Sequence, residues 1–524
     1  MSKRRPTRAT ANSVNSSPAA TTPFDAELLA ALGLDALIPA PLAHWRTLVS
    51  DGLTFFLTRL PAERVATIIT EQLVLGIDPD ADAACRLVAL MARCPTLHKL
   101  GQIVARHPQL DENLRRQLQK LESLPATTPH ELVLARIRHE LENSSVIADT
   151  QAAHIEIGSE ALAEGSVAVV MPFTWRQGDE VQHGVFKVLK PGIEDMLAQE
   201  LAILVELAPY LEERSRALVL PPVDYRDMLE TVQRLMTREV HLDIEQQNLR
   251  AAAAFYAEEP LIQVPDLLPW CTPRMTAMER IFGTKVTDAE LTPVLRQQLA
   301  ETMISALLGQ PFWSTDDRAV VHADLHAGNL FVTADGRLAV LDWSLTAGLT
   351  KTQREALVAI VLGGLLLDAD SIRRAVATLG TITHDDPILS AAVERALDQV
   401  AFQGHRPGFD WLLALFDELA LHTAAGFWED FVLLRKSWLS LSGVIGDLAG
   451  SGVISPDPQL IGLALQRFLT EMPSRPLAQA GAQHFASHVS NADLLRLSAS
   501  PWLISLRWWD RCTRQTWGWL GVSR

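Results

Sequence analysis

The chain has 524 residues, 48% of them apolar, and a formal net charge of −16. This length accommodates two or three domains, or one two-lobed unit with extensions. The acidic balance argues against a general nucleic-acid binder, which needs a basic surface. Its four cysteines are scattered, without the close spacing of a metal site, as expected in a reducing compartment without a disulfide framework.

The first segment, residues 1–24, is basic, free of acids and rich in Ser, Thr, Ala and Pro. It lacks the apolar core of a secretory signal, so we predict a disordered tail, with an organelle transit peptide as the alternative. No run reaches the ~18–20 apolar residues that span a bilayer. The longest, residues 357–367, predicts a buried helix, and we expect a cytoplasmic protein with or without peripheral membrane contact.

Residues 25–150 are leucine-rich, with helical apolar spacing and short Pro-bearing breaks. This pattern predicts a helical extension at the N-terminal side of the molecule. The pattern then changes to strands over residues 166–173 and 184–190, with a polar turn near residues 177–179.

Helical spacing returns over residues 194–213 and again over residues 225–257, and a strand is predicted for residues 274–279. Beyond this strand the chain is predicted to be mostly helical, apart from one hairpin between residues 329 and 342. A small sheet-bearing region followed by a larger helical region is the order of the two lobes of a protein kinase.

The most informative segment reads Val-His-Ala-Asp-Leu-His-Ala-Gly-Asn and ends at Asn329. It places Asp324 five residues before Asn329, and Asp342 follows thirteen residues after Asn329. Protein kinases use an Asp, an Asn and an Asp at this spacing as the catalytic residue and two metal ligands. Magnesium, which neutralises ATP phosphates, prefers such oxygen ligands. The alternative is an ordinary surface hairpin with a polar loop.

The spacing between Asn329 and Asp342 suggests a geometry for the metal ligands. Two strand-like runs flank Asp335-Gly336, a strong signal for a two-residue hairpin turn. Centred on that turn, Thr333 faces residue 338 and Asn329 faces Asp342. Directly opposed residues have Cβ atoms ~4.5–5.5 Å apart, so these two side chains are predicted to share a metal.

Lys187 lies in the strand-like run 184–190, where alternation places it on one face with Val185 and Leu189. A lysine between apolar neighbours on a buried face is costly unless it is paired. It is therefore a candidate for binding phosphates, with a side chain that snorkels to water as the alternative. Lys190 points to the opposite face and is expected to be solvated.

Two glutamates, Glu239 and Glu245, lie six residues apart in the predicted helix 225–257. At ~100° per residue they face different directions and can serve two different partners, with solvated surface charges as the alternative. Lys99 and Gln102 share a helix face. Gly101 between them costs ~1 kcal/mol against Ala, which suggests close approach of another backbone, although composition alone favours a structural role.

The chain resembles the UbiB-type atypical kinase family in five motifs that occur in the family's order. The matching segments are residues 99–102, 185–193, 239–248, 272–281 and 322–329. They correspond to Lys-x-Gly-Gln, the strand lysine running into Pro-Gly-Ile, Glu-x-Asp-x-x-x-Glu-Ala-x-Asn, the Thr-Pro-Arg-x-x-x-Met-Glu-Arg-Ile hinge, and His-x-Asp-x-His-x-Gly-Asn. The resemblance covers about residues 90–350.

The resemblance implies a two-lobed protein-kinase-like α+β fold that binds ATP and magnesium. It implies that Lys187 holds phosphates and pairs with Glu245, and that Lys99 pairs with Glu239 over the nucleotide site. The family's extension occupies the place of a peptide substrate, which links its members to ATP hydrolysis and to lipid or isoprenoid quinone metabolism. The remaining implied site residues are Asp324 as catalytic base, Asn329 and Asp342 as magnesium ligands, and Ser166, Met278 and Glu279 at the nucleotide.

The sequence departs from the family pattern at three places. The Ala-rich nucleotide loop keeps Ser166 but contains Glu164-Gly165, where an acid is expected to repel phosphates. The metal motif reads Asp342-Trp-Ser rather than Asp-Phe-Gly, and His241 replaces the family's Asp. The metal ligands remain, so these changes suggest a divergent branch with its own task.

The implied organisation has five parts. They are a tail at 1–24, the helical extension at 25–150, a small mixed-sheet lobe at 151–278, a mostly helical lobe at 279–490, and a Trp-rich segment at 491–524. The last segment holds five tryptophans and more basic than acidic residues. This composition is typical of an interfacial membrane helix, and the alternative is docking of the tryptophans as core.

We therefore expect an ATP-dependent atypical kinase or ATPase acting on a lipid-like or other small molecule, such as a polyketide-like secondary metabolite. A small-molecule phosphotransferase of the aminoglycoside-kinase type is the first alternative, because it shares the His-x-Asp loop and the Asp-Trp pair. A non-catalytic nucleotide-binding scaffold in a biosynthetic enzyme complex is the second, because the Ala-rich loop is altered.

Overall fold

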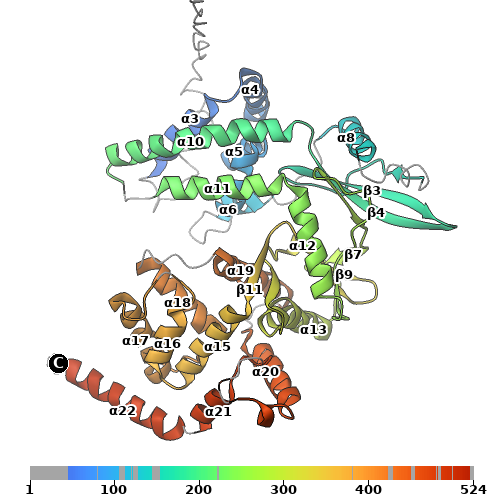
Figure 1. Cartoon of the computed structure of the whole chain (residues 1–524). Coiled ribbons are helices and arrows are strands. Elements are labelled where there is room, and N and C mark those ends of the chain that lie inside the picture. The colour runs from blue at the N-terminus through green and yellow to red at the C-terminus, as the bar shows by residue number, and fades with distance from the viewer. Residues whose placement is uncertain are drawn as a thin grey trace, which may run out of the picture. The chain divides into compact units, whose positions relative to one another are not determined.

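The computed structural model contains one chain, shown in Figure 1. The structure describes residues 45–78, 81–104, 112–119, 121, 128–143, 154–220, 224–380, 382–422, 429–449, 455–479, 481, 485–498 and 500–519. The predicted tail lies outside the described residues.

The chain forms two compact units, each assembled from separate segments. The first unit comprises Met1–Thr127, Ala163–Ala168 and Lys190–Val240, and the second comprises Thr128–Leu162, Val169–Leu189 and His241–Arg524. The chain therefore passes between the units several times, and the five-part division remains a prediction.

The first unit is helical in its described part, as its apolar spacing predicted. Its helices are α3 (Arg46–Leu57), α4 (Ala62–Ile77), α5 (Ala83–Ala92), α6 (Pro95–Val104), α7 (Glu112–Gln119), α10 (Ile193–Ala217) and α11 (Tyr225–Glu239), with the short strand β2 (Ala163–Glu164). Helices α10 and α11 pack along each other, and α6 contacts both (Figure 1).

Helix α6 is held at its N-terminus by a buried carboxylate. The carboxylate of Glu200, fully buried in α10, accepts hydrogen bonds from the backbone N–H of Thr96 at 2.9 Å and from its hydroxyl at 2.7 Å. A carboxylate at a helix N-terminus satisfies its unpaired N–H groups and its dipole. A Cβ on Gly101 would lie 2.6 Å from Leu121, so the close neighbour is a side chain and not the predicted backbone.

The sheet of the second unit has the strand order β1-β3-β4-β6. These strands are β1 (Glu156–Ile157), β3 (Ala168–Gln177), β4 (Glu180–Leu189) and β6 (Met275–Glu279). The predicted turn between β3 and β4 is present, with Gly178 at a φ of 65°. Helix α8 (His130–Glu142) packs on β4, and the rings of Phe173 and Phe186 stack with centroids 3.8 Å apart in the core.

The rest of the second unit is mostly helical, with a four-stranded sheet of order β5-β10-β9-β7 and the pair β8–β11. Its strands are β5 (Ile262–Gln263), β7 (Gly283–Lys285), β8 (Arg318–His322), β9 (Leu330–Thr333), β10 (Leu338–Val340) and β11 (Thr346–Thr350). Small sheets within a mainly helical chain make the fold α+β, as predicted.

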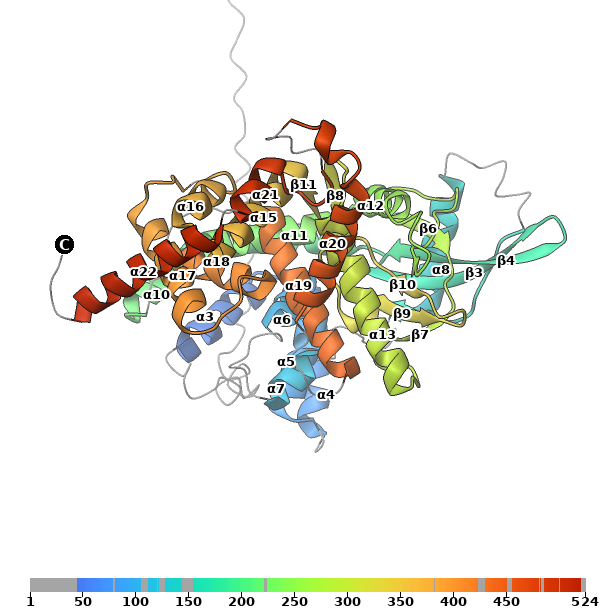
Figure 2. The same cartoon turned by 90° about the horizontal axis from the view of Figure 1, so that it is seen from below.

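The helices of this region are seen most clearly in Figure 2. They are α12 (Leu242–Phe255), α13 (Pro293–Met303), α14 (Gln310–Phe312), α15 (Lys351–Leu365), α16 (Ala369–Ala377), α17 (Pro387–Phe402), α18 (Phe409–His422), α19 (Glu429–Ala449), α20 (Asp457–Glu471), α21 (Asn491–Ser498) and α22 (Ser500–Trp519). Helix α15 contains residues 357–365 of the run for which a buried helix was predicted. Among the described residues, no helix combines the length and apolar character needed to cross a bilayer.

The hairpin forms, but its predicted register is wrong by one residue. Val332 pairs with Leu338 and Leu330 with Val340, so Leu341 rather than Asp342 donates its N–H to Asn329 O. The loop has three residues because Gly336, at a φ of 83°, adds a left-handed position after the turn. Such a three-residue connection is common in hairpins, and one residue of shift moves side chains to the opposite face.

The predicted helix 225–257 is also interrupted. Helix α11 ends at Glu239 and α12 begins at Leu242, with His241 between them in a non-helical conformation. The N–H of Leu242 bonds to Pro273 O rather than to a carbonyl of α11. Glu239 and Glu245 therefore belong to different helices and different units, so the idea that one helix serves two lysines is wrong.

Candidate functional site

Lys187 forms the centre of a buried charged cluster in the second unit. Its Nζ lies 2.8 Å from Oε1 of Glu245 and 3.1 Å from Oδ1 of Asp342. The lysine side chain is 14% exposed and that of Glu245 only 4%. Lys187 is mostly buried as predicted, although both faces of this part of β4 are buried, and two carboxylates compensate its charge.

Both charges of the Lys187–Asp342 pair are stabilised. Burial by itself would lower the pKa of Lys187, but Asp342 and Glu245 outweigh this effect and raise it above the ordinary value. Burial would raise the pKa of Asp342, but Lys187 and hydrogen bonds from Ser344 lower it below its usual range. The pair of Lys187 and Asp342 is therefore held in its charged form, with Glu245 as a second partner of the lysine.

The carboxylate of Asp342 is presented by an unusual backbone. Its φ is 54°, a left-handed conformation that Asp and Asn tolerate better than most residues. Oδ1 accepts from both Lys187 and the N–H of Ser344, and the side chain is 40% exposed. This leaves Oδ2 available for a further ligand.

Helix α12 ties Glu245 to the neighbouring loops. The amide of Gln246 donates to Thr272 O at 2.8 Å, and Nδ2 of Asn248 donates to Trp343 O at 3.0 Å. Because Trp343 follows Asp342, the Asn248 contact joins the helix that carries Glu245 to the backbone beside Asp342. The family motif that contains Glu245 and Asn248 thus has a direct structural basis.

The loop after β8 is organised by a buried histidine. Burial lowers the pKa of His322. Its Nδ1 accepts from the N–H of Asp324 at 3.2 Å, which assigns the proton to Nε2, and Nε2 donates to Leu341 O at 3.0 Å. A neutral His322 therefore connects the loop that carries Asp324 to the strand end before Asp342.

Asn329 is 8% exposed and its Nδ2 donates to Asp324 O at 3.1 Å. The amide nitrogen of Asn329 thus bonds to the loop that carries Asp324, and the amide oxygen can bind a metal ion. Together with Oδ2 of Asp342, this supplies hard oxygen donors of the type that magnesium prefers. These donors are of the type that magnesium accepts, and among the described residues there is no group of three or more His, Cys, Asp or Glu side chains placed for a metal.

Asp324 makes a contact that no sequence signal indicated. Its Oδ1 lies 3.0 Å from Nζ of Lys436 in α19, and the two side chains are 23% and 38% exposed. Helix α19 also reaches this loop through Ser437, whose hydroxyl donates to His322 O at 2.6 Å. Lys436 lies far along the chain in a segment without a motif, so spacing could not have identified it.

The two residues predicted at the nucleotide hinge, Met278 and Glu279, lie at the end of β6. Met278 pairs with Val185 of β4, and the N–H of Glu279 donates to Asp266 O at 2.8 Å. Burial raises the pKa of the Glu279 carboxyl. Both residues thus belong to the same sheet as Lys187, because β6 is hydrogen-bonded directly to β4.

The remaining predicted site residues gather in the first unit. Nζ of Lys99 is paired with Oε1 of Glu239, and the hydroxyl of Ser166 donates to the second oxygen of Glu239 at 3.1 Å. Lys99 and Glu239 are 20% and 19% exposed. The predicted Lys99–Glu239 pair is present, whereas the side chain of Gln102 lies outside the described residues.

One further expectation about this region is wrong. Lys190 is not simply solvated, because its Nζ lies 2.8 Å from Glu164 Oε1 and its side chain is 20% exposed. The reason is a long-range pairing that strand alternation does not reveal. Glu164 is 3% exposed and pairs with this lysine, and its predicted repulsion of phosphates stays a prediction.

Comparison with known proteins places the chain among atypical kinases. A family model described as the ABC1 atypical kinase-like domain matches residues 133–376. The chain is 30% identical over 447 residues to the probable protein kinase UbiB of Pseudomonas fluorescens strain Pf-5, covering 81% of this chain and 79% of that protein. It is 26% identical over 373 residues to the probable protein kinase UbiB of Pseudomonas paraeruginosa, covering 68% and 67%.

A solved structure, the complex of Rv3197 with erythromycin from Mycobacterium tuberculosis, matches with a TM-score of 0.42 and 17% identity. The match covers 74% of this chain and 95% of that chain. The family match confirms the kinase-like α+β fold that the motifs predicted. The extent and identity of the Pseudomonas fluorescens match show that the chain belongs to the UbiB-type atypical kinase family.

Proposed function

We propose that this protein binds ATP with magnesium and cleaves its terminal phosphate bond in the metabolism of a lipid-like, isoprenoid-quinone or other small molecule. The observation that carries the proposal is the Lys187 cluster, in which one buried cation faces two carboxylates. Carboxylate oxygens beside a phosphate-binding lysine are the setting in which a metal cation binds with ATP.

Each residue of the cluster has a distinct proposed role. Lys187 holds phosphate oxygens, and Glu245 orients it from α12. Asn329 and Asp342 hold magnesium, which when bound neutralises the charge of the phosphates. Met278 and Glu279 contribute to the nucleotide pocket, and this assignment rests on the family motif.

Asp324 is the proposed general base or water-orienting residue. Its carboxylate accepts the proton of the attacking hydroxyl or positions a water molecule. Lys436, 3.0 Å away, positions this carboxylate. Lys436 is therefore a positioning residue rather than a catalytic one.

The Lys99 cluster is proposed to restrain turnover. Lys99, Glu239 and Ser166 lie in the unit that contains the helical extension. The family resemblance assigns this extension a role over the nucleotide, and the closed pairing of Lys99 with Glu239 supports a latch within the unit.

The test is phosphate release from ATP by the full chain with and without magnesium. Asp324→Asn is expected to reduce the rate at least about 100-fold, the scale of a lost general base, while nucleotide-induced stabilisation persists. Lys436→Ala should lower the rate less and shift the pH profile, whereas Arg435→Ala on the same helix should not. Unchanged turnover in Asp324→Asn would exclude this role.

Two other functions predict different results in the same assay. A small-molecule phosphotransferase of the aminoglycoside-kinase type would transfer phosphate to an added acceptor and release little to water. A non-catalytic scaffold in a biosynthetic complex would bind nucleotide without turnover. Candidate acceptors with hydroxyl groups, including polyketide-like compounds, distinguish the first case.

A peripheral membrane contact is the proposed role of the C-terminal segment. In α22, Trp502, Leu506 and Trp509 are 81%, 64% and 63% exposed, so the described tryptophans do not pack as core. Trp517 and Trp519 have side chains outside the described residues. The predicted basic attraction is weaker than composition suggested, because Arg507 and Arg511 pair with acids of neighbouring helices.

Co-sedimentation with liposomes tests this contact. We expect weak binding that is lost on truncation after Asn491 and in Trp502→Ser/Trp509→Ser, driven by the aromatic side chains more than by charge. Full-length protein that stays in the supernatant with both neutral and anionic liposomes would refute the proposal.

A further inference from the structure

The helical part of the second unit contains a large apolar cavity of about 1120 Å³. Five segments contribute to its wall: α14, α15, the α17–α18 loop with the start of α18, α20 and α21. Small-molecule sites are typically concave, mostly apolar and of ~300–1,000 Å³. Nothing in the proposed nucleotide chemistry uses this cavity.

Part of the cavity wall is formed by aromatic side chains whose indole N–H groups bond to backbone carbonyls. The indole Nε1 of Trp313 donates to Leu460 O at 3.0 Å, and that of Trp411 donates to Ala396 O at 3.1 Å. These side chains therefore offer carbon surface to an occupant. Phe312 and Phe409 extend the same wall.

Two helices also line the cavity with apolar side chains that remain exposed. Leu365 of α15 is 49% exposed, and Ile461 and Leu465 of α20 are 65% and 56% exposed. Ile461 and Leu465 are one helical turn apart and so lie on one face. Exposure of such contiguous apolar surface in water is costly, and it commonly marks a binding site.

Several polar residues of the wall lie in or beside the loop that joins α17 and α18. Gln399, His405 and Arg406 line it, and within the described part of the chain their side chains make no hydrogen bond or ion pair. Asp410 accepts from Nε1 of Trp438 at 3.3 Å, and Asp457 accepts from the N–H of Phe409 at 2.7 Å. This part of the wall offers both donors and acceptors.

The mixed charges in this part of the wall select the chemistry of the occupant. A cationic head would meet Arg406, and an anionic head would meet Asp410 and Asp457. A neutral hydroxyl or carbonyl group can bond to either kind without electrostatic conflict. An occupant with a long or bulky apolar body and one neutral polar end therefore matches the cavity.

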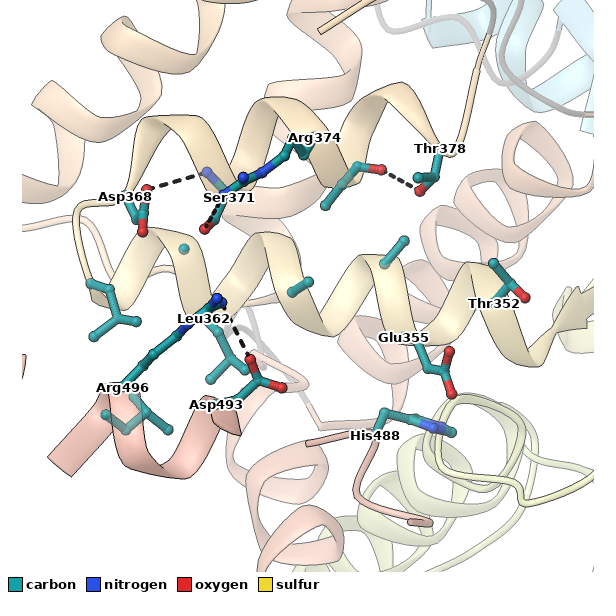
Figure 3. A pocket seen from close by; sticks show the side chains of 16 residues that line it. Thr352, Glu355, Leu362, Asp368, Ser371, Arg374, Thr378, His488, Asp493 and Arg496 are labelled. Carbon is teal, nitrogen blue, oxygen red and sulfur yellow. Dashed lines mark hydrogen bonds and ion pairs between the residues drawn. The ribbon is translucent and has the colours of Figure 1, made fainter. Parts of the chain in front are cut away.

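A smaller cavity of about 430 Å³ lies beside it and contrasts with it (Figure 3). Leu362 and Leu497 line both cavities, so α15 and α21 separate them. The smaller one has a mixed polar and apolar lining, and its charged groups pair with one another or with nearby helices, as Arg496 does with Asp493. It has no comparable apolar surface to cover.

We propose that the large cavity binds one molecule of a neutral amphiphile, with its apolar body between α15 and α20 and its polar end at residues 405–406. The site is separate from the nucleotide cluster, so its occupation does not depend on the proposed function. A protein segment fits less well because the cavity, walled by five segments and open to solvent, has a volume close to the small-molecule range.

The test uses the full chain without nucleotide and the neutral fluorophore N-phenylnaphthylamine. We expect saturable binding at one site per chain and displacement by 1-dodecanol more readily than by dodecanoate or dodecyltrimethylammonium, all below micelle-forming concentrations. Ile461→Asp and Leu465→Asp should each weaken binding about tenfold or more, because a charge would be placed in the apolar part of the site.

Leu469→Asp is the matched control, since Leu469 is 60% exposed on the same helix but does not line the cavity. Its affinity should stay within about twofold of wild type. Ala464→Phe fills the cavity with apolar atoms and should also reduce binding, which covers the case in which a charged variant misfolds.

Three results would overturn the proposal. They are absence of saturable binding, an equal loss in Leu469→Asp, and wild-type affinity in Ala464→Phe. Neutral phosphatidylcholine vesicles separate a single bound molecule from a membrane surface. Protein that binds vesicles but not the monomeric probes would show that this face is a membrane contact instead.

Discussion

Lys187 and Lys99 each pair with a glutamate, but their surroundings differ. Lys187 faces two carboxylates, Glu245 and Asp342, whereas Lys99 faces Glu239, whose other oxygen is occupied by the hydroxyl of Ser166. In the first cluster two carboxyl groups contact one lysine. In the second, one carboxyl group contacts one lysine and one hydroxyl group.

The two clusters also differ in construction. Lys187 extends from a central strand, and it joins residues 58 and 155 positions away in the sequence. Lys99 extends from a short helix whose N-terminus is fixed by Glu200. Both units thus contain a Lys–Glu pair, and the pairs differ in the third residue, a carboxylate beside Lys187 and a hydroxyl group beside Glu239.

The largest effect is expected when Lys187 is removed. In Lys187→Met, the carboxylate of Glu245 stays buried without its cation, which costs ~3–5 kcal/mol for a broken buried pair. The free energy of unfolding measured with urea should fall accordingly. Lys187→Met/Glu245→Gln should recover part of the loss, and the same stability in single and double variants would contradict the role of Glu245 as partner.

The second prediction concerns the binding of magnesium with ATP at the Lys187 cluster. Magnesium with ATP at 100 times its dissociation constant should stabilise the wild type by ~2.7 kcal/mol, measured as a rise in Tm. Asp342→Asn should lose most of that rise. Asp335→Asn in the hairpin turn is the control and should keep it, because Asp335 bonds only within the turn. An unchanged rise in Asp342→Asn would place the metal elsewhere.

A smaller effect is expected in the Lys99 cluster. Lys99→Ala removes a half-buried pair and should cost ~1–2 kcal/mol of stability, while the fold persists. We also expect altered nucleotide preference or autophosphorylation, measured with ATP and ADP. Arg59→Ala, which breaks the exposed pair with Glu206, is the control. Wild-type nucleotide binding, turnover and autophosphorylation in Lys99→Ala would remove any regulatory role of the latch.

The smallest effect concerns pH. The pKa of Asp342 is lower in the folded protein than the unfolded carboxyl value of ~3.9. Its ionised form therefore stabilises the protein above that pH, and this contribution is lost as the pH falls from ~3.9 through the folded pKa. Because the side chain is 40% exposed, we expect less than ~1 kcal/mol. The stability difference between wild type and Asp342→Asn should shrink between pH 5 and pH 3, in urea titrations at low salt. A difference that stays constant would contradict this assignment.

Local spacing in the sequence predicted some features of the strands and helices correctly and missed others. The alternation of β4 predicted the burial of Lys187, and the turn signal predicted the hairpin of β9 and β10. It missed the register, because Gly336 adopts a positive φ and lengthens the loop by one residue. It also missed the break at His241, because the partner of the following N–H is Pro273.

The sequence by itself determined the family and the α+β class. It also identified the site candidates Lys187, Asp324, Asn329 and Asp342, because each lies in a short motif that can be read from residue types and their spacing along the chain. Only the tertiary structure decided which charges meet. The Lys436–Asp324 and Lys190–Glu164 contacts, and the apolar cavity between α15 and α20, join segments that no local pattern relates. Such contacts depend on how helices and strands pack, since packing alone brings distant residues within a few ångströms.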